Sequence, residues 1–253
     1  MKLSLEDFTP EDIPVIERLD IERLPRHIAV IMDGNGRWAT QQGLPRFFGH
    51  HAGTESIRAV IKACQGLGID FLTLYSFSTE NWSRPDDEVD ALMHLIEEQL
   101  RIETAYLHKR GVRVRHLGRL TGLPASLRQT IHDSETLTAG NARMTLILAI
   151  NYSGRTELLD AARRLATAAA AGLVDPELLQ EDDVARSLYL PDVPDPELLI
   201  RTAGEQRVSN YLLWQIAYSE FWFTPVLWPE FRAPHLLEAL EEYQRRQRKF
   251  GRI

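Results

Sequence analysis

The sequence has 253 residues, of which 44% are hydrophobic and 26% are charged, and its formal net charge is −7. This length suits one well-packed α/β domain and is short for two, so we predict a single domain over residues 1–253. The negative charge argues against a nucleic-acid-binding protein, because such proteins bind phosphate through many Lys and Arg side chains.

The cysteine content and the N-terminus predict the compartment. Cys64 is the only cysteine, so no intrachain disulfide can form, which fits a reducing environment. The first residues, MKLSLEDFTPEDIP, are acidic and interrupted by proline, and they lack the basic start and apolar stretch of a signal peptide. No apolar run has the length of a bilayer span. We therefore expect a cytoplasmic protein.

Apolar strand-like runs alternate with helical patterns along the chain, after a peripheral N-terminal arm expected over residues 1–24. The predicted strands are Ile28–Asp33, Asp70–Phe77, 112–118, 143–152, 196–204 and 220–224. The predicted helices lie near His51–Leu67, Asp86–Arg110, Pro124–Ala139, Gly154–Gly172 and from Pro234 onward. Near-continuous apolar strands between helices indicate a parallel sheet covered on both faces. The predicted fold is α/β, with a central parallel sheet of about six strands flanked by helices.

The first predicted strand ends at Asp33, and ligands of parallel sheets bind beyond the carboxyl ends of the strands. Gly34, Asn35 and Gly36 follow directly. Glycines let the backbone turn sharply, and consecutive N–H groups in such a turn bind anions. No acidic residue occurs from Gly34 to Thr54, whereas the basic residues Arg37, Arg46, His50 and His51 all fall there.

A diphosphate fits this basic window, because Arg donates in a fork that matches phosphate oxygens. Asp33 would repel the diphosphate unless a cation lay between them. Mg2+ takes one or two carboxylates together with substrate phosphate oxygens, so Asp33 is predicted to anchor Mg2+. For an isolated D-G-N-G, a plain turn with Asp33 as a helix cap is the alternative. The basic window favours the diphosphate site.

The residues Gly34–Ala39 also fit the letters of the dinucleotide-binding fingerprint. An Asp stands where the cofactor pyrophosphate would approach, and Trp38 and Pro45 should disturb the helix that begins at once in that fold. The second strand ends in Ser76 and Phe77 rather than in a ribose-binding acid. A dinucleotide oxidoreductase is therefore a distant alternative.

The loop after the second strand carries a hydroxyl, an amide, an indole and a guanidinium within seven residues, Ser78, Thr79, Glu80, Asn81, Trp82, Ser83 and Arg84. Such a loop could orient a diphosphate and shield a reacting carbon. For Trp82 alone, a polar turn whose indole covers the edge of the core is an equal alternative.

A second set of donors follows the fifth predicted strand. Arg201 closes a run that should be buried, and a buried charge needs a partner or a ligand. Arg207 and Ser209 follow closely, so the three side chains could bind a second diphosphate. An ion pair between Arg201 and Glu205 is the alternative. Glu220 opens the last strand and is a candidate second carboxylate for the metal.

The acidic run at Asp86, Asp87 and Asp90 spells D-D-x-x-D, the metal motif of trans-prenyltransferases. Those enzymes are all-helical and need two such motifs, whereas here one motif lies in an α/β pattern. Asp86 and Asp87 follow Pro85, where negative charge complements the helix dipole. We interpret the run as the start of a helix.

Six motifs together resemble the cis-prenyltransferase family, with the greatest similarity to bacterial undecaprenyl diphosphate synthases. They read HIAVIMDGNGRWA, GHHAGTESI, LTLYSFSTENWSRP, INYSGRTELLDA, IRTAGEQRVSNYLLWQ and YSEFWFTPVLWPEF. They follow the family's order and spacing from about His27 to the final helix. The resemblance implies a single-domain α/β fold with a parallel sheet, an elongated apolar tunnel and a homodimer.

The resemblance also implies residue roles. Asp33 resembles the magnesium-linked catalytic aspartate. The allylic diphosphate site corresponds to Gly34, Asn35, Gly36, Arg37, Trp38, Arg46 and His50. The mobile catalytic loop corresponds to Ser78, Thr79, Glu80, Asn81, Trp82 and Arg84, with Asn81 in a catalytic role. The isopentenyl diphosphate site corresponds to Arg201, Arg207 and Ser209, with Glu220 as a metal-associated carboxylate. Ala203 stands where relatives often carry Ser or Gly, and Gln206 where some carry a metal-binding His.

The implied reaction is the successive cis-condensation of isopentenyl diphosphate onto an allylic diphosphate, with Mg2+ as cofactor. We expect farnesyl diphosphate as primer and a long product such as undecaprenyl diphosphate, the precursor of the cell-wall lipid carrier. A short-chain synthase, which bulky side chains near Met144 would indicate, stays open, and so does a non-catalytic subunit, which should lose Asp33 and Arg46. The proton acceptor stays open among Asn81, Ser78, His50 and released diphosphate. Peripheral contact with the inner membrane face is expected for product release.

Overall fold

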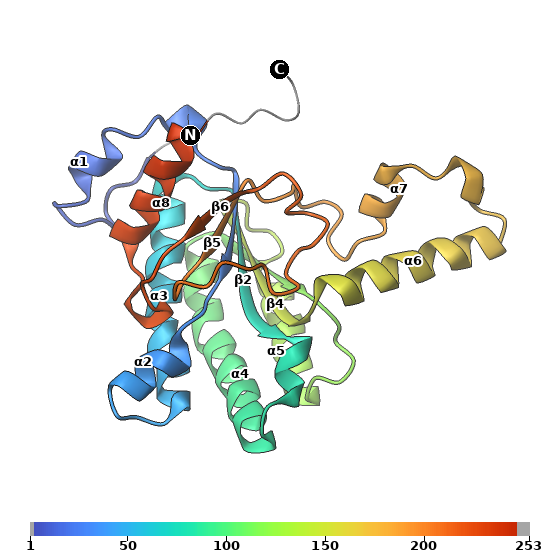
Figure 1. The fold of residues 1–253 in the computed structure, drawn as a ribbon, viewed down its shortest axis with the longest axis horizontal. Coiled ribbons are helices and arrows are strands. Elements are labelled where there is room, and N and C mark those ends of the chain that lie inside the picture. Colours follow the sequence, from blue (N-terminus) through green and yellow to red (C-terminus); the bar gives the residue numbers. More distant parts are fainter. Residues whose placement is uncertain (1–2, 247–253) are drawn as a thin grey trace.

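The computed structural model describes residues 3–246, which form one six-stranded sheet with helices around it (Figure 1). The strands are β1 (His27–Ile31), β2 (Phe71–Ser78), β3 (Val112–Leu117), β4 (Met144–Tyr152), β5 (Leu198–Arg201) and β6 (Glu220–Phe223). Their order across the sheet is β3-β4-β2-β1-β5-β6, and every neighbouring pair is parallel. The predicted α/β fold with about six parallel strands is confirmed.

The helices occupy most of the segments between the strands. They are α1 (Ile13–Ile16), α2 (Asn35–Gln41), α3 (Arg46–Leu67), α4 (Asp86–Lys109), α5 (Ala125–Thr138), α6 (Gly154–Ala170), α7 (Glu181–Arg186) and α8 (Ala233–Arg245), with 3-10 turns at Ile21–Arg23, Thr79–Ser83, Pro176–Leu178 and Trp228–Glu230. The five longer helices predicted from periodicity are confirmed. The short helices α2 and α7 were not predicted, because seven and six residues are too few to display a helical period.

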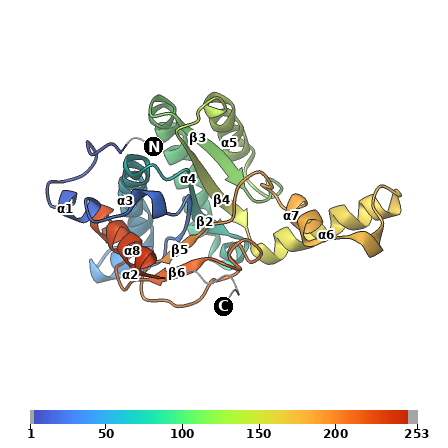
Figure 2. The same ribbon diagram turned by 90° about the horizontal axis from the view of Figure 1, so that it is seen from above.

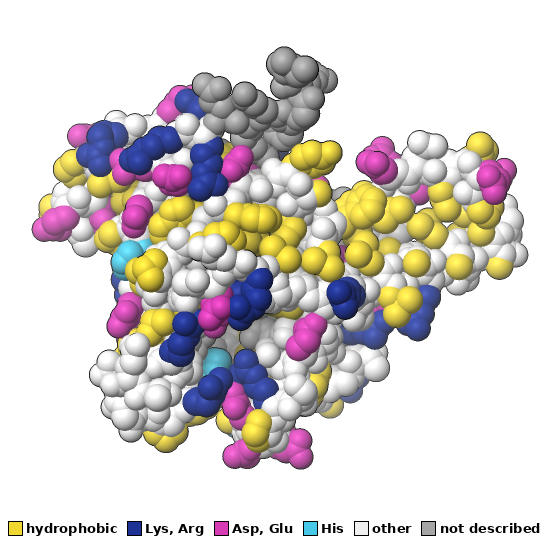
Figure 3. Space-filling view, in the orientation of Figure 1, with side chains coloured by type: hydrophobic (Ala, Val, Ile, Leu, Met, Phe, Trp, Pro, Cys, Tyr) yellow, Lys and Arg dark blue, Asp and Glu magenta, His cyan; other side chains and the backbone are white. Residues whose placement is uncertain are grey.

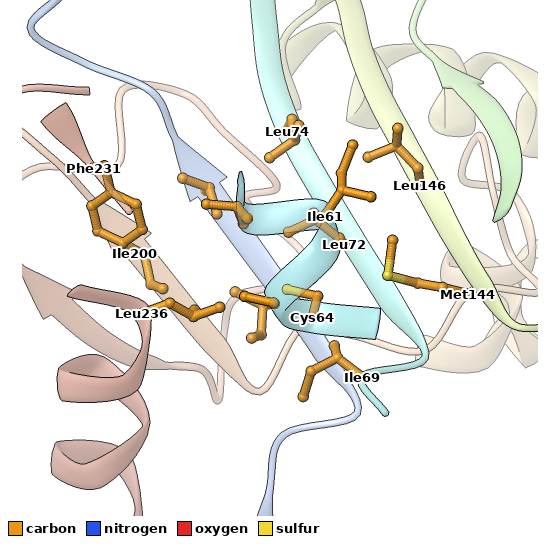
Figure 4. Packing of buried hydrophobic residues seen from close by; sticks show 14 of the residues in the cluster. Ile61, Cys64, Ile69, Leu72, Leu74, Met144, Leu146, Ile200, Phe231 and Leu236 are labelled. Atoms are coloured by element: carbon orange, nitrogen blue, oxygen red, sulfur yellow. The ribbon is translucent and has the colours of Figure 1, made fainter. Parts of the chain in front are cut away.

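Side chains of the central strands alternate between two apolar clusters, as the period of a strand requires. On β1, Ile28 and Val30 join the cluster that contains residues of α3, α4 and α8. Figure 4 shows part of this cluster, with Ile61 and Cys64 of α3 packed against β2 and β4. Ala29 and Ile31 face the other way, toward a cluster that the segment before β6 completes with Tyr211, Leu212 and Ile216. Both faces of the sheet are therefore covered.

The predicted N-terminal arm, as far as the structure describes it, is docked on the last helix. Ile16 and Leu19 are buried in the main core. Arg18 forms an ion pair of 2.9 Å with Glu241 of α8. The arm thus joins the two ends of the domain, while its first two residues lie outside the described part.

Helices α6 and α7 project from the body of the molecule in both ribbon views (Figures 1 and 2). The projection exposes large apolar side chains, with Leu173 78% exposed and Leu178 71% exposed. In residues 3–246, no helix combines the length and the hydropathy needed to cross a membrane.

Candidate active site

A cavity of about 610 Å3 opens between strands β1, β2 and β4 and helices α3 and α4. Where the strands end, its lining is polar and includes Asp33, Asn35, His50, Ser78, Glu80, Asn81, Arg84, Arg201 and Ser209. Along the helices and β4 its lining is largely apolar and includes Ile57, Ile61, Leu92, Leu95, Ile96, Leu100, Leu146 and Leu148. Figure 3 shows basic and acidic side chains gathered around a histidine and a shallow hollow in the lower half of this face. An ionic mouth thus leads to a mostly apolar interior.

Asp33 and Arg201 meet at the mouth because their strands are neighbours. Ile31, two residues before Asp33, pairs in register with Arg201 on β5. Arg201 Nη2 donates to Asp33 Oδ2 over 2.9 Å, and the arginine side chain is 4% exposed. Asp33 is therefore an ion-pair partner of the buried Arg201 guanidinium. Glu205, the partner considered from the sequence, pairs instead with Arg37 and Arg207.

The remaining donors of Arg201 point to the segment after β5. Its Nη1 donates to Ser209 Oγ over 2.7 Å and to the carbonyl of Arg207. Its Nε is buried and has no hydrogen-bond partner. An unpaired buried donor on a cation is costly, so this guanidinium is poised for an anion at the mouth.

The turn after β1 is built around Gly34, whose φ is +102°. A Cβ at Gly34 would lie 2.9 Å from Ala203 Cβ, so a larger residue is excluded by both conformation and space. The Gly34 N–H donates to Asp33 Oδ1 over 2.7 Å. Helix α2 begins at once with Asn35, and the prediction that Trp38 and Pro45 would prevent this is wrong, because Trp38 lies inside the helix and Pro45 lies beyond it.

Two helices converge on this turn. A Cβ at Gly36 would lie 2.9 Å from the Arg46 guanidinium carbon, so that guanidinium covers the start of α2. A Cβ at Gly49 would lie 1.8 Å from the carbonyl oxygen of Asn35. Gly49, which was given no role from the sequence, thus brings α3 into contact with the turn after β1.

Glu88 is a second residue whose position the sequence analysis missed. The predicted helix start at the acidic run is confirmed, since α4 begins at Asp86. Glu88 Oε1 lies 2.8 Å from Arg84 Nη1 and 3.7 Å from Arg46 Nε. One carboxylate therefore gathers a guanidinium from α3 and one from the loop after β2.

His50 lines the cavity close to these arginines. Burial, with a further contribution from Arg84, lowers its pKa to about 4. Its Nε2 is buried and has no hydrogen-bond partner. The imidazole is consequently neutral near pH 7.

The loop after β2 divides between two hollows. Asn81 Oδ1 accepts the Ser78 N–H over 3.0 Å, which fixes the turn, and both residues line the main cavity. Trp82 and Thr79 instead line a separate hollow, where Trp82 Nε1 donates to Asn151 Oδ1 over 2.8 Å. The structure does not bring Trp82 and Thr79 to the cavity, so their predicted contact with substrate stays a prediction.

The chain matches known proteins over most of its length. A family model described as "Putative undecaprenyl diphosphate synthase" matches residues 31–251. An isoprenyl transferase of Heliobacterium mobile is 49% identical over 237 residues, covering 94% of this chain and 91% of the relative. An isoprenyl transferase of Prochlorococcus marinus subsp. pastoris is 47% identical over 236 residues, covering 93% of this chain and 87% of the relative.

The chain belongs to the undecaprenyl diphosphate synthase family.

Two solved structures agree with this assignment. Lavandulyl diphosphate synthase of Lavandula x intermedia, in complex with dimethylallyl diphosphate, has a TM-score of 0.87 and 37% identity and covers 91% of this chain and 99% of its own. A probable undecaprenyl diphosphate synthase of Campylobacter jejuni has a TM-score of 0.76 and 31% identity, and the match covers 90% of this chain and 99% of that structure's chain. The enzyme is a prenyltransferase, and the dinucleotide oxidoreductase alternative is excluded.

In this prenyltransferase Glu220 lies at the wrong edge of the sheet to join Asp33. It opens β6 and pairs with Leu198, whereas Phe223 at the carboxyl end pairs with Arg201. Glu220 and Phe223 are three residues apart on β6, which corresponds to about 10 Å along the strand. Glu220 also accepts a hydrogen bond of 3.0 Å from Arg246. Within this chain Glu220 therefore does not lie beside Asp33, because a residue that opens a parallel strand lies at its amino edge, and its predicted association with the metal stays a prediction.

Of the two acidic residues predicted to bind the metal, Asp33 is the one that lines the cavity mouth. Among residues 3–246, no three His, Cys, Asp or Glu side chains are grouped to hold an ion. Asp33 lines the cavity with a side chain that is 32% exposed. One accessible carboxylate fits Mg2+, which commonly takes one or two carboxylates and leaves its other positions to water and substrate phosphate.

Proposed function

We propose that this enzyme adds isopentenyl diphosphate units in cis to an allylic diphosphate, with farnesyl diphosphate as primer. The proposed product is a long polyprenyl diphosphate such as undecaprenyl diphosphate, the precursor of the lipid carrier for cell-wall synthesis. The carrying observation is the cavity, whose mouth presents Arg84, Arg201 and Asp33 and whose interior is mostly apolar. A diphosphate ester of a hydrocarbon has the same division into a charged and an apolar end.

The allylic diphosphate is proposed to bind between α2 and α3. The first N–H groups of α2 lack partners within the helix, and Arg46 covers Gly36 at that point. The bound dimethylallyl diphosphate of the lavandulyl diphosphate synthase structure supports an allylic diphosphate as ligand of this fold. Donors arranged in advance stabilise the negative charge that develops on the departing diphosphate.

Isopentenyl diphosphate is proposed to bind to Arg201, Arg207 and Ser209. Arg201 Nε has no hydrogen-bond partner, and Ser209 lines the cavity. The isopentenyl double bond attacks the allylic carbon, the bond from that carbon to the diphosphate oxygen breaks, and a proton leaves the isopentenyl unit. The neutral imidazole of His50 is one candidate acceptor for that proton, beside Asn81, Ser78 and the released diphosphate.

Asp33 is proposed to hold Mg2+, which would neutralise phosphate charge and orient the diphosphate. Arg201 keeps the Asp33 carboxylate turned toward the neighbouring strand. The apolar side chains of α3, α4 and β4 are proposed to enclose the growing hydrocarbon, which is the tunnel implied by the family resemblance.

The decisive experiment is a product assay on the purified enzyme. Farnesyl diphosphate, labelled isopentenyl diphosphate and Mg2+ are incubated with the enzyme, and the products are sized by chromatography. Long products support the proposal, and products that stop after one or two additions support a short-chain synthase. Asp33→Ala should remove turnover with an unchanged melting curve. Substantial activity of this variant would exclude Asp33 from the reaction.

The quaternary structure and location are also proposals. We propose a cytoplasmic homodimer that touches the membrane peripherally to release its product. The projection formed by α6, α7 and the segment between them exposes Leu159, Leu173 and Leu178, which a second copy could cover. Analytical ultracentrifugation tests the dimer, and flotation with lipid vesicles tests the membrane contact. A monomer at micromolar concentration would contradict the dimer.

A further inference from the structure

The interior of the cavity is lined by one ion pair, away from the proposed diphosphate sites at the mouth. Arg58 of α3 and Glu103 of α4 both line the cavity, and Nε and Nη2 of Arg58 both donate to Glu103 Oε1. Arg58 lies eight residues beyond His50 on α3, which is about 12 Å along the helix. The pair is therefore too deep to contact the groups at the mouth.

This ion pair also faces the outside of the molecule. The Arg58 side chain is 48% exposed, whereas that of Glu103 is 18% exposed. A side chain that lines a cavity and is half exposed marks a place where the wall is one side chain thick. The Arg58–Glu103 pair thus closes the seam between α3 and α4.

Each member of the pair has a polar neighbour three residues away on its own helix. Glu55 lies three residues before Arg58, and its charge contributes to the raised pKa of Arg58. Tyr106 lies three residues after Glu103, and its buried hydroxyl has no hydrogen-bond partner, although the Arg110 guanidinium lies 5.7 Å from its ring centre. If the pair opens, Arg58 can turn to Glu55, and the Glu103 carboxylate can accept the Tyr106 hydroxyl. The structure shows the closed arrangement of the seam, and these neighbours supply the partners that an open arrangement would need.

The size of the cavity makes the open arrangement necessary for a long product. A cavity of about 610 Å3 lies within the range that encloses a drug-sized ligand. A chain of many isoprene units exceeds such a ligand several-fold, and it cannot displace the tightly packed core around Cys64. The thin wall at the α3–α4 seam is the route that needs only an exchange of ion-pair partners.

We propose that the Arg58–Glu103 ion pair is a latch on the α3–α4 seam, which the elongating hydrocarbon opens once it has filled the cavity. The pair is thereby a determinant of product length. This inference rests on the proposed polyprenyl elongation, because an enzyme that stops after one addition has no need to open the seam.

The test is a reversible lock on the seam. Arg58→Cys and Glu103→Cys are combined, and the two thiols are joined by a short bis-maleimide, with joining checked by intact mass. The native Cys64 is buried, and burial raises its thiol pKa to about 12, so it does not react. The matched control joins Arg18→Cys to Glu241→Cys, an ion pair between the N-terminal arm and α8, outside the cavity.

The joined seam should leave the first condensation from farnesyl diphosphate within about twofold of the unjoined variant, because the mouth is unchanged. Later condensations should stop, so the product distribution shifts to short chains. The joined control should keep the full-length distribution. Full-length products from the joined seam would overturn the latch.

A second variant covers the case in which the double substitution does not fold. Glu103→Gln keeps the shape of the side chain and removes its charge, and exposed ion pairs add little stability, so the fold should persist. We expect faster late condensations and longer chains at equal times. A distribution equal to that of the unchanged enzyme would count against the latch. Absence of any prenyl transfer by the unchanged enzyme would instead overturn the proposed function.

Discussion

Arg201 donates to Asp33 over 2.9 Å, and the two side chains differ in exposure, at 4% for the arginine and 32% for the aspartate. The buried cation thus fixes one oxygen of a carboxylate whose remainder faces the cavity. Since Arg201 also donates to Ser209 and keeps Nε unpaired, it connects the metal carboxylate we propose to the proposed isopentenyl diphosphate site.

Arg201→Ala should lower kcat/KM for isopentenyl diphosphate by at least about 100-fold. Truncating one partner of a buried, hydrogen-bonded charge pair costs about 2–5 kcal/mol, and the variant also loses a donor to substrate. Arg201→Lys keeps the charge but loses the forked arrangement of donors, so its kcat/KM should lie between those of the unchanged enzyme and Arg201→Ala. Initial rates at varied isopentenyl diphosphate measure the effect. An unchanged KM in both variants would separate Arg201 from this substrate.

Glu88→Gln should raise the KM for the allylic diphosphate about three- to tenfold, with a smaller change in kcat. The amide cannot hold the two guanidinium groups of Arg46 and Arg84, so both lose their common partner. The matched control is Asp87→Asn, which changes the exposed neighbouring acid in the same helical turn. If the two variants had the same kinetics, Glu88 would act only as an acidic residue at the helix start and not in binding the allylic diphosphate.

The strands and long helices could be predicted because each has its own local signal. The near-continuous apolar run before Asp33 and the 24-residue helix α4 are examples. The alternation of strands and helices also predicted a parallel sheet, and so it placed Asp33 and Arg201 at the same carboxyl edge, although their ion pair was not predicted. Glu220 could have been placed correctly by the same reasoning, since a residue that opens a strand lies at the opposite edge.

The rest of the site depends on contacts between distant segments, which no local pattern encodes. Asn151 is an example, because it receives the Trp82 indole N–H and donates to the carbonyls of Arg119 and Thr121. Asn151 has a φ of +53°, and the apolar run of β4 does not predict this conformation. Glu88 was hidden in the same way behind a motif that fits a helix start.

The stability of the enzyme should fall as the pH is lowered from about 6.5 to about 4. Burial lowers the pKa of both His27 and His50 to about 4, below the ordinary value of 6.5. Between these values the unfolded chain binds protons that the folded chain does not, so stability is complete above pH 6.5 and is lost toward pH 4. Each histidine contributes about 1.4 kcal/mol per pH unit in this window.

Urea unfolding at several pH values between 4.5 and 7.5 measures the slope of the free energy of unfolding against pH. His50→Gln should remove its share of the slope, and His132→Gln, at an exposed position, should leave the slope unchanged. Equal slopes for the unchanged enzyme and His50→Gln would show that His50 is not held neutral by the fold.

Gly49→Ala should destabilise the fold and disable the anion-binding turn together. The added Cβ would lie 1.8 Å from the carbonyl oxygen of Asn35 and 2.6 Å from its carbon, and backbone cannot turn aside as a side chain can. Overpacking of this kind typically costs about 1–3 kcal/mol, and the displaced α2 should lower kcat/KM for the allylic diphosphate. The control is Gly140→Ala, since no atom lies within 4 Å of a Cβ there. Urea unfolding and the product assay measure both effects, and a Gly49→Ala enzyme as stable and as active as the control would show that α3 does not need this contact.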